Sequence, residues 1–346
     1  MTEPVIISAV CPPRPSALMT SAPDTPAPPP PGRTPPWPLL AYAACVLAGT
    51  VAGWGGRWHW LLDLASHFRS IWLLLAIAGL VACARWPSRF AAVCLALAAA
   101  GNAAEMLPYW LPARGVEDAS AATGPRVTVV VANVHRLNDD ATAAVAYLRD
   151  RRPDVAAILE VDAAWANAVA GLADIFPYRV VRPRTDNFGI ALLSRWPLDD
   201  VTVVDFGVPG RPSIVATVLA ASHFRFIATH PYPPFHGRAT AVLNAHLEAV
   251  AAAAAASPLP CIVAGDFNAT PWSHPFRTLV AKGGLRDTAV GRGVQATWNA
   301  RYPVPRIPID HILVPPSVTV VRRVVGPDIG SDHFPIEAEL ILRATE

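Results

Sequence analysis

The pattern of hydrophobic and polar residues divides the chain into three parts of unlike character. Residues 1–36 are rich in proline, alanine, serine and threonine, with no regular spacing of apolar residues. A segment of this composition buries too little apolar surface to offset the entropy lost on ordering. We therefore expect a disordered tail over residues 1–36.

Three apolar runs follow, at residues 37–56, 70–84 and 90–104. The first run is long enough to cross a bilayer as a helix. The other two are shorter, but Arg69, Arg85 and Arg89 flank them and can extend toward lipid headgroups. A buried helical hairpin of a soluble protein is the alternative, and the lack of a polar face argues against it. The pattern predicts a transmembrane region over residues 37–111 and a linker over residues 112–125.

The arginines near these runs indicate an orientation. Arg14 and Arg33 precede the first run, and Arg85 and Arg89 lie between the second and third. The positive-inside rule then places the N-terminal tail in the cytoplasm. Three crossings predict an integral protein of a bacterial-type inner or plasma membrane, with everything after residue 111 outside the cytoplasm. The side depends on how many of the three spans cross.

From residue 126 onward, short β-rich runs alternate with turns and a few helices. Nine strands and only three helices do not fit a regular βαβ repeat, so we expect an α/β (α+β) fold of two packed sheets flanked by helices. The strands are predicted at residues 127–134, 155–159, 190–194, 214–219, 224–229, 262–264, 309–314, 318–325 and 336–342, and the helices at 141–152, 238–256 and 274–281.

The charge of this second half bears on its partners. From residue 115 it holds 21 Lys and Arg against 22 Asp and Glu, a net charge of −1. Tight non-specific binding of duplex nucleic acid needs a basic face that displaces phosphate counterions, so nucleic acid is possible but not favoured. The single cysteine of this half, Cys261, excludes a disulfide framework or a cysteine-based zinc site within it.

Polar residues interrupt the apolar strands at their ends. Any one of them alone is more simply a turn or a helix cap, but eight together indicate a site built on a rigid scaffold. The eight residues are Asn133, Glu160, His230, Asp266, Asn268, Asp310, Asp332 and His333.

The sequence around these residues resembles the endonuclease/exonuclease/phosphatase superfamily. That superfamily includes secreted DNases, abasic-site endonucleases, inositol-phosphate phosphatases and sphingomyelinases. The resemblance spans residues 126–342 and implies a DNase I-like, four-layer α/β/β/α sandwich of two mixed sheets. It rests on seven motifs in the family's order: ANV (132–134), LEV (159–161), FGIALLSR (188–195), ATHP (228–231), GDFN (265–268), IDHILV (309–314) and SDHFP (331–335).

The chemistry of a metal site points first to Glu160. A carboxylate that closes an apolar strand is costly unless it is paired or coordinated. Hard oxygen ligands suit Mg²⁺ or Mn²⁺, and we expect Asn133 and Asp332 to complete the coordination.

The remaining residues are candidates for catalysis. Asp266 and Asn268 are two apart, so in extended backbone their side chains point the same way. The resemblance implies that Asp266 activates the attacking water, that Asn268 contacts phosphate, and that Asp310 pairs with His333. A histidine at position 230 suggests a general acid for the leaving group. Other residues of the motif loops, among them His135, Tyr232 and Trp298, are interpreted as scaffold or surface.

These observations predict a membrane-anchored, metal-dependent hydrolase of phosphoesters. The anchor and the absence of a basic balance favour a phosphorylated lipid or small molecule, including lipid-linked phosphates and pyrophosphates. Two alternatives stay open: a metal-dependent endonuclease or exonuclease, and a membrane-tethered scaffold without catalysis.

Overall fold

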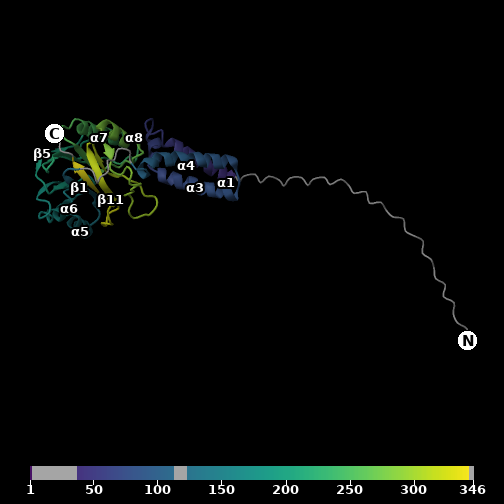
Figure 1. The fold of residues 1–346 in the computed structure, drawn as a ribbon, viewed down its shortest axis with the longest axis horizontal. Helices are drawn as coiled ribbons and strands as arrows, with labels where there is room; N and C mark the ends of the chain where they lie inside the picture. Colours follow the sequence, from purple (N-terminus) through teal and green to yellow (C-terminus); the bar gives the residue numbers. More distant parts are fainter. Residues whose placement is uncertain (2–36, 113–122, 343–346) are drawn as a thin grey trace. The chain divides into compact units, whose positions relative to one another are not determined.

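The computed structural model describes Met1 and residues 37–112 and 123–342 (Figure 1). The predicted tail at 2–36 and most of the predicted linker lie outside the described residues. Residues 36–346 form one compact unit. Its first part is helical and its second part carries the two sheets.

The three apolar runs are helical, as expected. The helices are α1 (Trp37–Ala52), α3 (Arg69–Arg85) and α4 (Arg89–Trp110), which lie side by side (Figure 1). The sequence pattern did not predict the short α2 (Trp60–Ser66), whose first turn is capped by the His59 side chain. A bend of 66° separates α2 from α3. Residues 60–85 therefore form two helices rather than one.

One helix in the described part, α4, is long and apolar enough to cross a membrane. The count becomes two if the bent pair of α2 and α3 is taken as one span, and α1 is shorter. Inside the bundle, Arg69 is fully buried and donates to Thr50 O and Asn102 Oδ1. A buried guanidinium needs such acceptors because water is excluded around it.

The second part contains two six-stranded mixed sheets. The first has the order β11–β12–β1–β2–β4–β3 and the second β5–β6–β7–β8–β10–β9. In the first sheet the strands are, in that order, Val318–Val325, Ile336–Leu342, Arg126–Asn133, Val155–Leu159, Ile190–Ser194 and Tyr178–Arg182. In the second they are Leu198–Val204, Ser213–Val218, Phe224–Ala228, Cys261–Asp266, Asp310–Val314 and Arg286–Asp287.

Apolar side chains from both sheets meet in a central core, in which Val129 and Val131 of β1 join Phe226 of β7 and Ile312 of β10. This arrangement follows from strands that are apolar on both faces, because each sheet also has helices on its outer face. The result is the predicted four-layer α/β/β/α sandwich.

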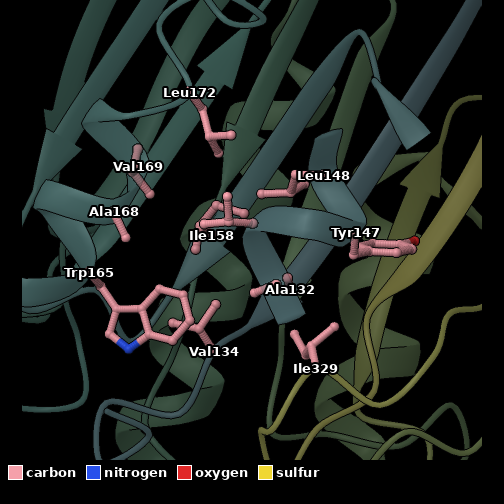
Figure 2. A pocket seen from close by; sticks show the side chains of 12 residues that line it. Ala132, Val134, Tyr147, Leu148, Ile158, Trp165, Ala168, Val169, Leu172 and Ile329 are labelled. Carbon is pink, nitrogen blue, oxygen red and sulfur yellow. The ribbon is translucent and has the colours of Figure 1, made fainter. Parts of the chain in front are cut away.

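Helices cover the outer face of each sheet. α5 (Thr142–Arg151) and α6 (Ala163–Ala170) pack on the first sheet, where Leu148 and Trp165 meet Ile158 (Figure 2). α7 (Gly237–Ala255) and α8 (His274–Gly283) pack on the second through Leu243, Leu247 and neighbouring residues.

All nine predicted strands are present, with shifts of one or two residues at their ends. The sequence pattern missed β3, β5, β9 and α6. β3 and β5 are edge strands with exposed or half-exposed side chains. An edge strand keeps neither the continuous apolar run nor the strict alternation that identifies a strand in a sequence.

The helical part is joined to the sandwich by specific hydrogen bonds. Asp63 of α2 accepts the backbone N–H of His274 at the start of α8, at 2.7 Å. The carbonyl of Glu105 in α4 accepts the Trp272 indole N–H, at 3.2 Å. The Tyr109 hydroxyl donates to Asp287 at 3.4 Å, and Asp63 and Asp287 are both buried.

Two glycines allow the backbone to pass close to a neighbouring loop beside the strand ends. A Cβ on Gly189 would lie 1.8 Å from Val161 O, and a Cβ on Gly265 would lie 1.8 Å from Thr229 O. Both carbonyls belong to backbone, which cannot rotate away. Only glycine therefore fits at positions 189 and 265, because there is no room for a Cβ atom.

We expect Gly265→Ala to lower the free energy of unfolding by about 3 kcal/mol or more, since β7 and β8 must separate. The matched control is Gly284→Ala, at a left-handed helix end with nothing within 4 Å of the added Cβ. In the control, the free energy of unfolding should fall by only about 1 kcal/mol, because alanine strains the left-handed backbone. Denaturant unfolding of the purified full chain, followed by tryptophan fluorescence, measures both; equal losses would contradict the steric argument.

Candidate active site

The predicted site residues gather where the two sheets present their strand ends at one edge. β1 and β2 are parallel, as are β7 and β8, so the carboxyl ends of each pair lie together. Asn133 closes β1, Glu160 follows β2, His230 follows β7 by two residues and Asp266 closes β8. All eight predicted residues lie in or beside one cleft.

A buried charged cluster of Asp266, Asp310 and His333 forms its centre. Asp310 begins β10 directly opposite Asp266 in the antiparallel pair. The Nδ1 atom of His333 lies 2.9 Å from Asp310 Oδ2, and its Nε2 atom lies 3.6 Å from Asp266 Oδ2. All three side chains are buried, so each charge depends on its neighbours.

The charges of this cluster shift one another's protonation. Burial by itself lowers the pKa of His333, but Asp310 and Asp266 raise it to about 10. Burial raises the pKa of Asp310, and His333 outweighs this and lowers it below its usual value. Burial and the adjacent Asp310 raise the pKa of Asp266. His333 is therefore a cation held by two carboxyl groups.

His230 also lies close to the Asp266 carboxylate. Its Nε2 atom lies 3.5 Å from Asp266 Oδ2, and its ring packs against Phe188. The His230 side chain is buried and its Nδ1 atom has no hydrogen-bond partner among the described residues. Asp266 is thus flanked by two imidazoles.

Asn133 connects this cluster to Glu160. Its amide nitrogen lies 3.1 Å from Glu160 Oε1 and 3.1 Å from Asp266 Oδ2. The other oxygen of Glu160 accepts the backbone N–H of Arg136 at 3.1 Å. Both side chains are buried, and the amide fixes the carboxylates of Glu160 and Asp266 at a set separation.

Glu160 and Asp332 provide the carboxylates that suit a divalent cation. The His135 Nδ1 atom lies between them, 3.2 Å from Asp332 Oδ1 and 3.9 Å from Glu160 Oε2. Trp298 donates its indole N–H to the other oxygen of Asp332 at 3.1 Å. Glu160 and Asp332 are thus two carboxylates beside one imidazole, and hard oxygen ligands of this kind suit Mg²⁺ or Mn²⁺.

A second grouping satisfies the distances of a metal site. Ligand atoms of Asp266, Asp310 and His333 lie within 4.8 Å of one another. A protonated imidazole has no lone pair for a metal, however, and one nitrogen of His333 already bonds to Asp310. Glu160 and its neighbours therefore stay the predicted ligands, and this grouping is the second candidate position.

The expected arrangement of Asn268 is wrong in one respect. β8 ends at Asp266, and Asn268 has a left-handed φ of 49°, so strand alternation does not align the two side chains. Instead the Asn268 backbone N–H bonds Asp266 Oδ1 at 2.9 Å, and its amide donates to Pro231 O. A turn, not a strand, brings Asn268 to the cleft.

Backbone strain is concentrated at this site. His135, Glu160 and Asn268 all have left-handed φ values, of 55°, 62° and 49°. Such values cost of order 1 kcal/mol or more for residues with a Cβ and persist only where the surroundings hold them. The strain turns each of the three side chains toward the cleft.

The cleft has a volume of about 570 Å³, and its lining combines charged and aromatic side chains. The lining includes carboxylates and imidazoles as well as Phe188, Tyr232 and Trp298. Among the described residues that line it there is no lysine or arginine. His135, Tyr232 and Trp298, interpreted from the sequence as scaffold or surface, are thus lining residues of the cleft. For two of them a neighbouring motif was the available signal, since His135 follows ANV (132–134) and Tyr232 follows ATHP (228–231).

The sequence matches one known protein family over most of the sandwich. A model of the Endonuclease/Exonuclease/phosphatase family matches residues 130–333, more than half of the chain. The chain belongs to this family. Its members are metal-dependent phosphoester hydrolases, so the chain is an enzyme of that class. No curated protein matches the sequence.

Solved structures of low identity share the fold. An endonuclease/exonuclease/phosphatase from Beutenbergia cavernae is 23% identical over 63% of this chain and 72% of its own, with a TM-score of 0.52. The 3′ phosphatase NExo from Neisseria, bound to a product DNA hairpin, is 22% identical over 61% and 98%, also at 0.52. D. rerio TDP2, complexed with a single-strand DNA product, is 19% identical over 62% and 98%, with a TM-score of 0.52.

We expect Glu160→Gln to weaken Mn²⁺ binding about tenfold or more, because a neutral amide replaces a carboxylate ligand. Paramagnetic resonance of free Mn²⁺ measures the affinity. Asp186→Asn is the control, since Asp186 lines the same cleft but pairs with Arg184. Unchanged affinity in Glu160→Gln, with loss in Asp310→Asn, would place the metal in the Asp266–Asp310–His333 grouping.

Proposed function

We propose that this protein is a membrane-anchored, Mg²⁺-dependent hydrolase that acts on the phosphate or pyrophosphate of a lipid. The observation that carries the proposal is the composition of the cleft: buried acids and imidazoles lie beside aromatic and other apolar side chains, and none of the described lining residues is lysine or arginine. Arg211 packs over the rings of Phe188 and Tyr232. Such a cleft suits a substrate with one charged end and one apolar end.

The residues of the cluster have separable roles. Asp266 is placed to accept the proton of the attacking water, and cationic His333 neutralises charge on the phosphoryl oxygens. Asp310 holds the ring of His333 in position. Glu160, with Asn133 and Asp332, would hold a divalent cation, which would supply further charge neutralisation at the phosphate. Asn268 positions the phosphate through contacts at the turn.

His230 is the donor for the leaving oxygen. Its Nε2 atom lies 3.5 Å from Asp266 Oδ2, and its ring lies in the cleft against Phe188. A proton donated there leaves with the alcohol or the phosphate that is released.

Exposed apolar and aromatic side chains of the helices support a bilayer anchor. Leu74, Ile77 and Val81 of α3, with Val93 and Leu97 of α4, are exposed although strongly apolar. Exposed aromatic residues occur toward both ends of the helices, where the interface between membrane and water favours them. They are Trp37, Trp86 and Phe90 at one end, and Trp54, Trp58 and Trp110 at the other.

A nuclease is the second candidate, and two structures of similar fold hold product DNA. Cationic side chains and aromatic platforms are what a nucleic-acid groove needs. The cleft has the aromatic residues, but no lysine or arginine is among its described lining residues, and Arg211 is packed over Phe188 and Tyr232. This composition favours the lipid phosphate. A scaffold without catalysis is disfavoured, because several buried charges cost stability without a compensating use.

We expect the purified full chain to hydrolyse lipid phosphates or pyrophosphates with Mg²⁺, and EDTA to abolish the activity. Asp266→Asn should lower kcat about 100-fold or more, because a neutral amide is a poor proton acceptor. Phosphate release measures both, with Asp205→Asn as a control outside the cleft. Activity on DNA alone would overturn the proposed substrate.

We also expect the sandwich to lie outside the cytoplasm. Alkaline phosphatase fused after Glu346 should be active, and a cytoplasmic fluorescent reporter fused there should be dark. A signal from the cytoplasmic reporter alone would refute this orientation and indicate an even number of crossings.

A further inference from the structure

Part of the catalytic cleft is built by residues outside the matched family region. Leu64 of α2, together with His67 and Phe68 from the bend before α3, lines the same cleft as Asp266 and His333. These three residues precede residue 130, where the family match begins. The helical part therefore forms a wall of the site as well as a candidate anchor.

This wall is held against the sandwich by specific contacts. Asp63, the residue before Leu64, is buried and accepts the backbone N–H of His274. Trp60, the first residue of α2, lies so close to Gly237 that an added Cβ would be 3.0 Å from the indole. α2 is thus held against the sandwich at its first and fourth residues, and Leu64 follows directly after the second of these contacts.

A second apolar segment lines the cleft as well. Tyr232, Pro233, Pro234 and Phe235 line it, in the segment after His230. The Phe235 side chain is 73% exposed, a large fraction for a phenylalanine on a surface in contact with water. Leu64 and Phe68 are half-buried, so both have apolar surface left to cover.

We propose that Leu64, Phe68 and the 232–235 segment form a channel for the hydrocarbon chain of the substrate. This inference rests on the proposed function, since the phosphate of that substrate occupies the cluster around Asp266. Phe68 directly precedes α3, whose outer face exposes Leu74, Ile77 and Val81. The part of the channel formed by Phe68 is therefore continuous in the chain with α3, a helix of the proposed bilayer anchor.

The channel selects for a hydrocarbon chain by burying its methylene groups. Each methylene transferred from water adds about 0.8 kcal/mol of binding, roughly fourfold in affinity. Leu64→Ala removes apolar surface from the channel and leaves the residues of the phosphate site in place. We therefore expect Leu64 to affect the affinity for the hydrocarbon part of the substrate, and not the affinity for its charged end.

Binding of two non-hydrolysable phosphonates to the full chain, in detergent with Mg²⁺, tests this inference by calorimetry. We expect hexylphosphonate to bind wild type at least tenfold more tightly than ethylphosphonate. Leu64→Ala should reduce that ratio about fivefold, with ethylphosphonate binding unchanged within twofold. Leu61→Ala is the matched control, because Leu61 lies on the same helix, is 55% exposed and does not line the cleft.

Three results would overturn the channel: equal affinity of wild type for both phosphonates, equal losses for both in Leu64→Ala, or the same change in Leu61→Ala. The more conservative Leu64→Met should retain most of the ratio, which separates lost apolar contact from lost folding. If wild type binds neither phosphonate, the phosphate site itself fails, and the proposed function falls together with the channel.

Discussion

The pairing of His333 with Asp310 and Asp266 is the interaction on which the site depends. Three ionisable groups without access to water are stable only as a set, because removal of any one leaves an uncompensated charge. Two strands of the second sheet carry the acids, and the loop before β12 of the first sheet carries the imidazole. The cluster therefore also ties the two sheets together at their active edge.

Much of this arrangement could be predicted from the sequence because strand ends are visible in it. An apolar run that stops at Asn133, Glu160 or Asp266 places a polar side chain at the edge of a sheet. Parallel neighbours then bring such ends together. The sequence alone could not show that β10 faces β8 with Asp310 opposite Asp266, since register is set by the packing of both sheets.

The features that escaped prediction share a physical cause. β3 and β5 are edge strands with mixed exposure. α2 is a short helix set apart from α3 only by a bend, and a bend leaves no pattern in the sequence. His135 faces the cleft because of a left-handed backbone conformation that no local pattern announces. Leu64 and Phe68 lie between two predicted spans in the sequence, and only tertiary packing places them in the cleft that Asp266 lines.

The hydrogen bonds that join α4 to the sandwich have a consequence for how substrate arrives. The carbonyls of Pro108 and Tyr109, in the last turn of α4, accept backbone N–H groups of Gly291 and Gly293. A domain fastened in this way does not swing on a tether to search the surrounding solution. For a chain anchored in a bilayer, its encounters are then set by lateral diffusion of lipids toward a fixed opening, a search in two dimensions.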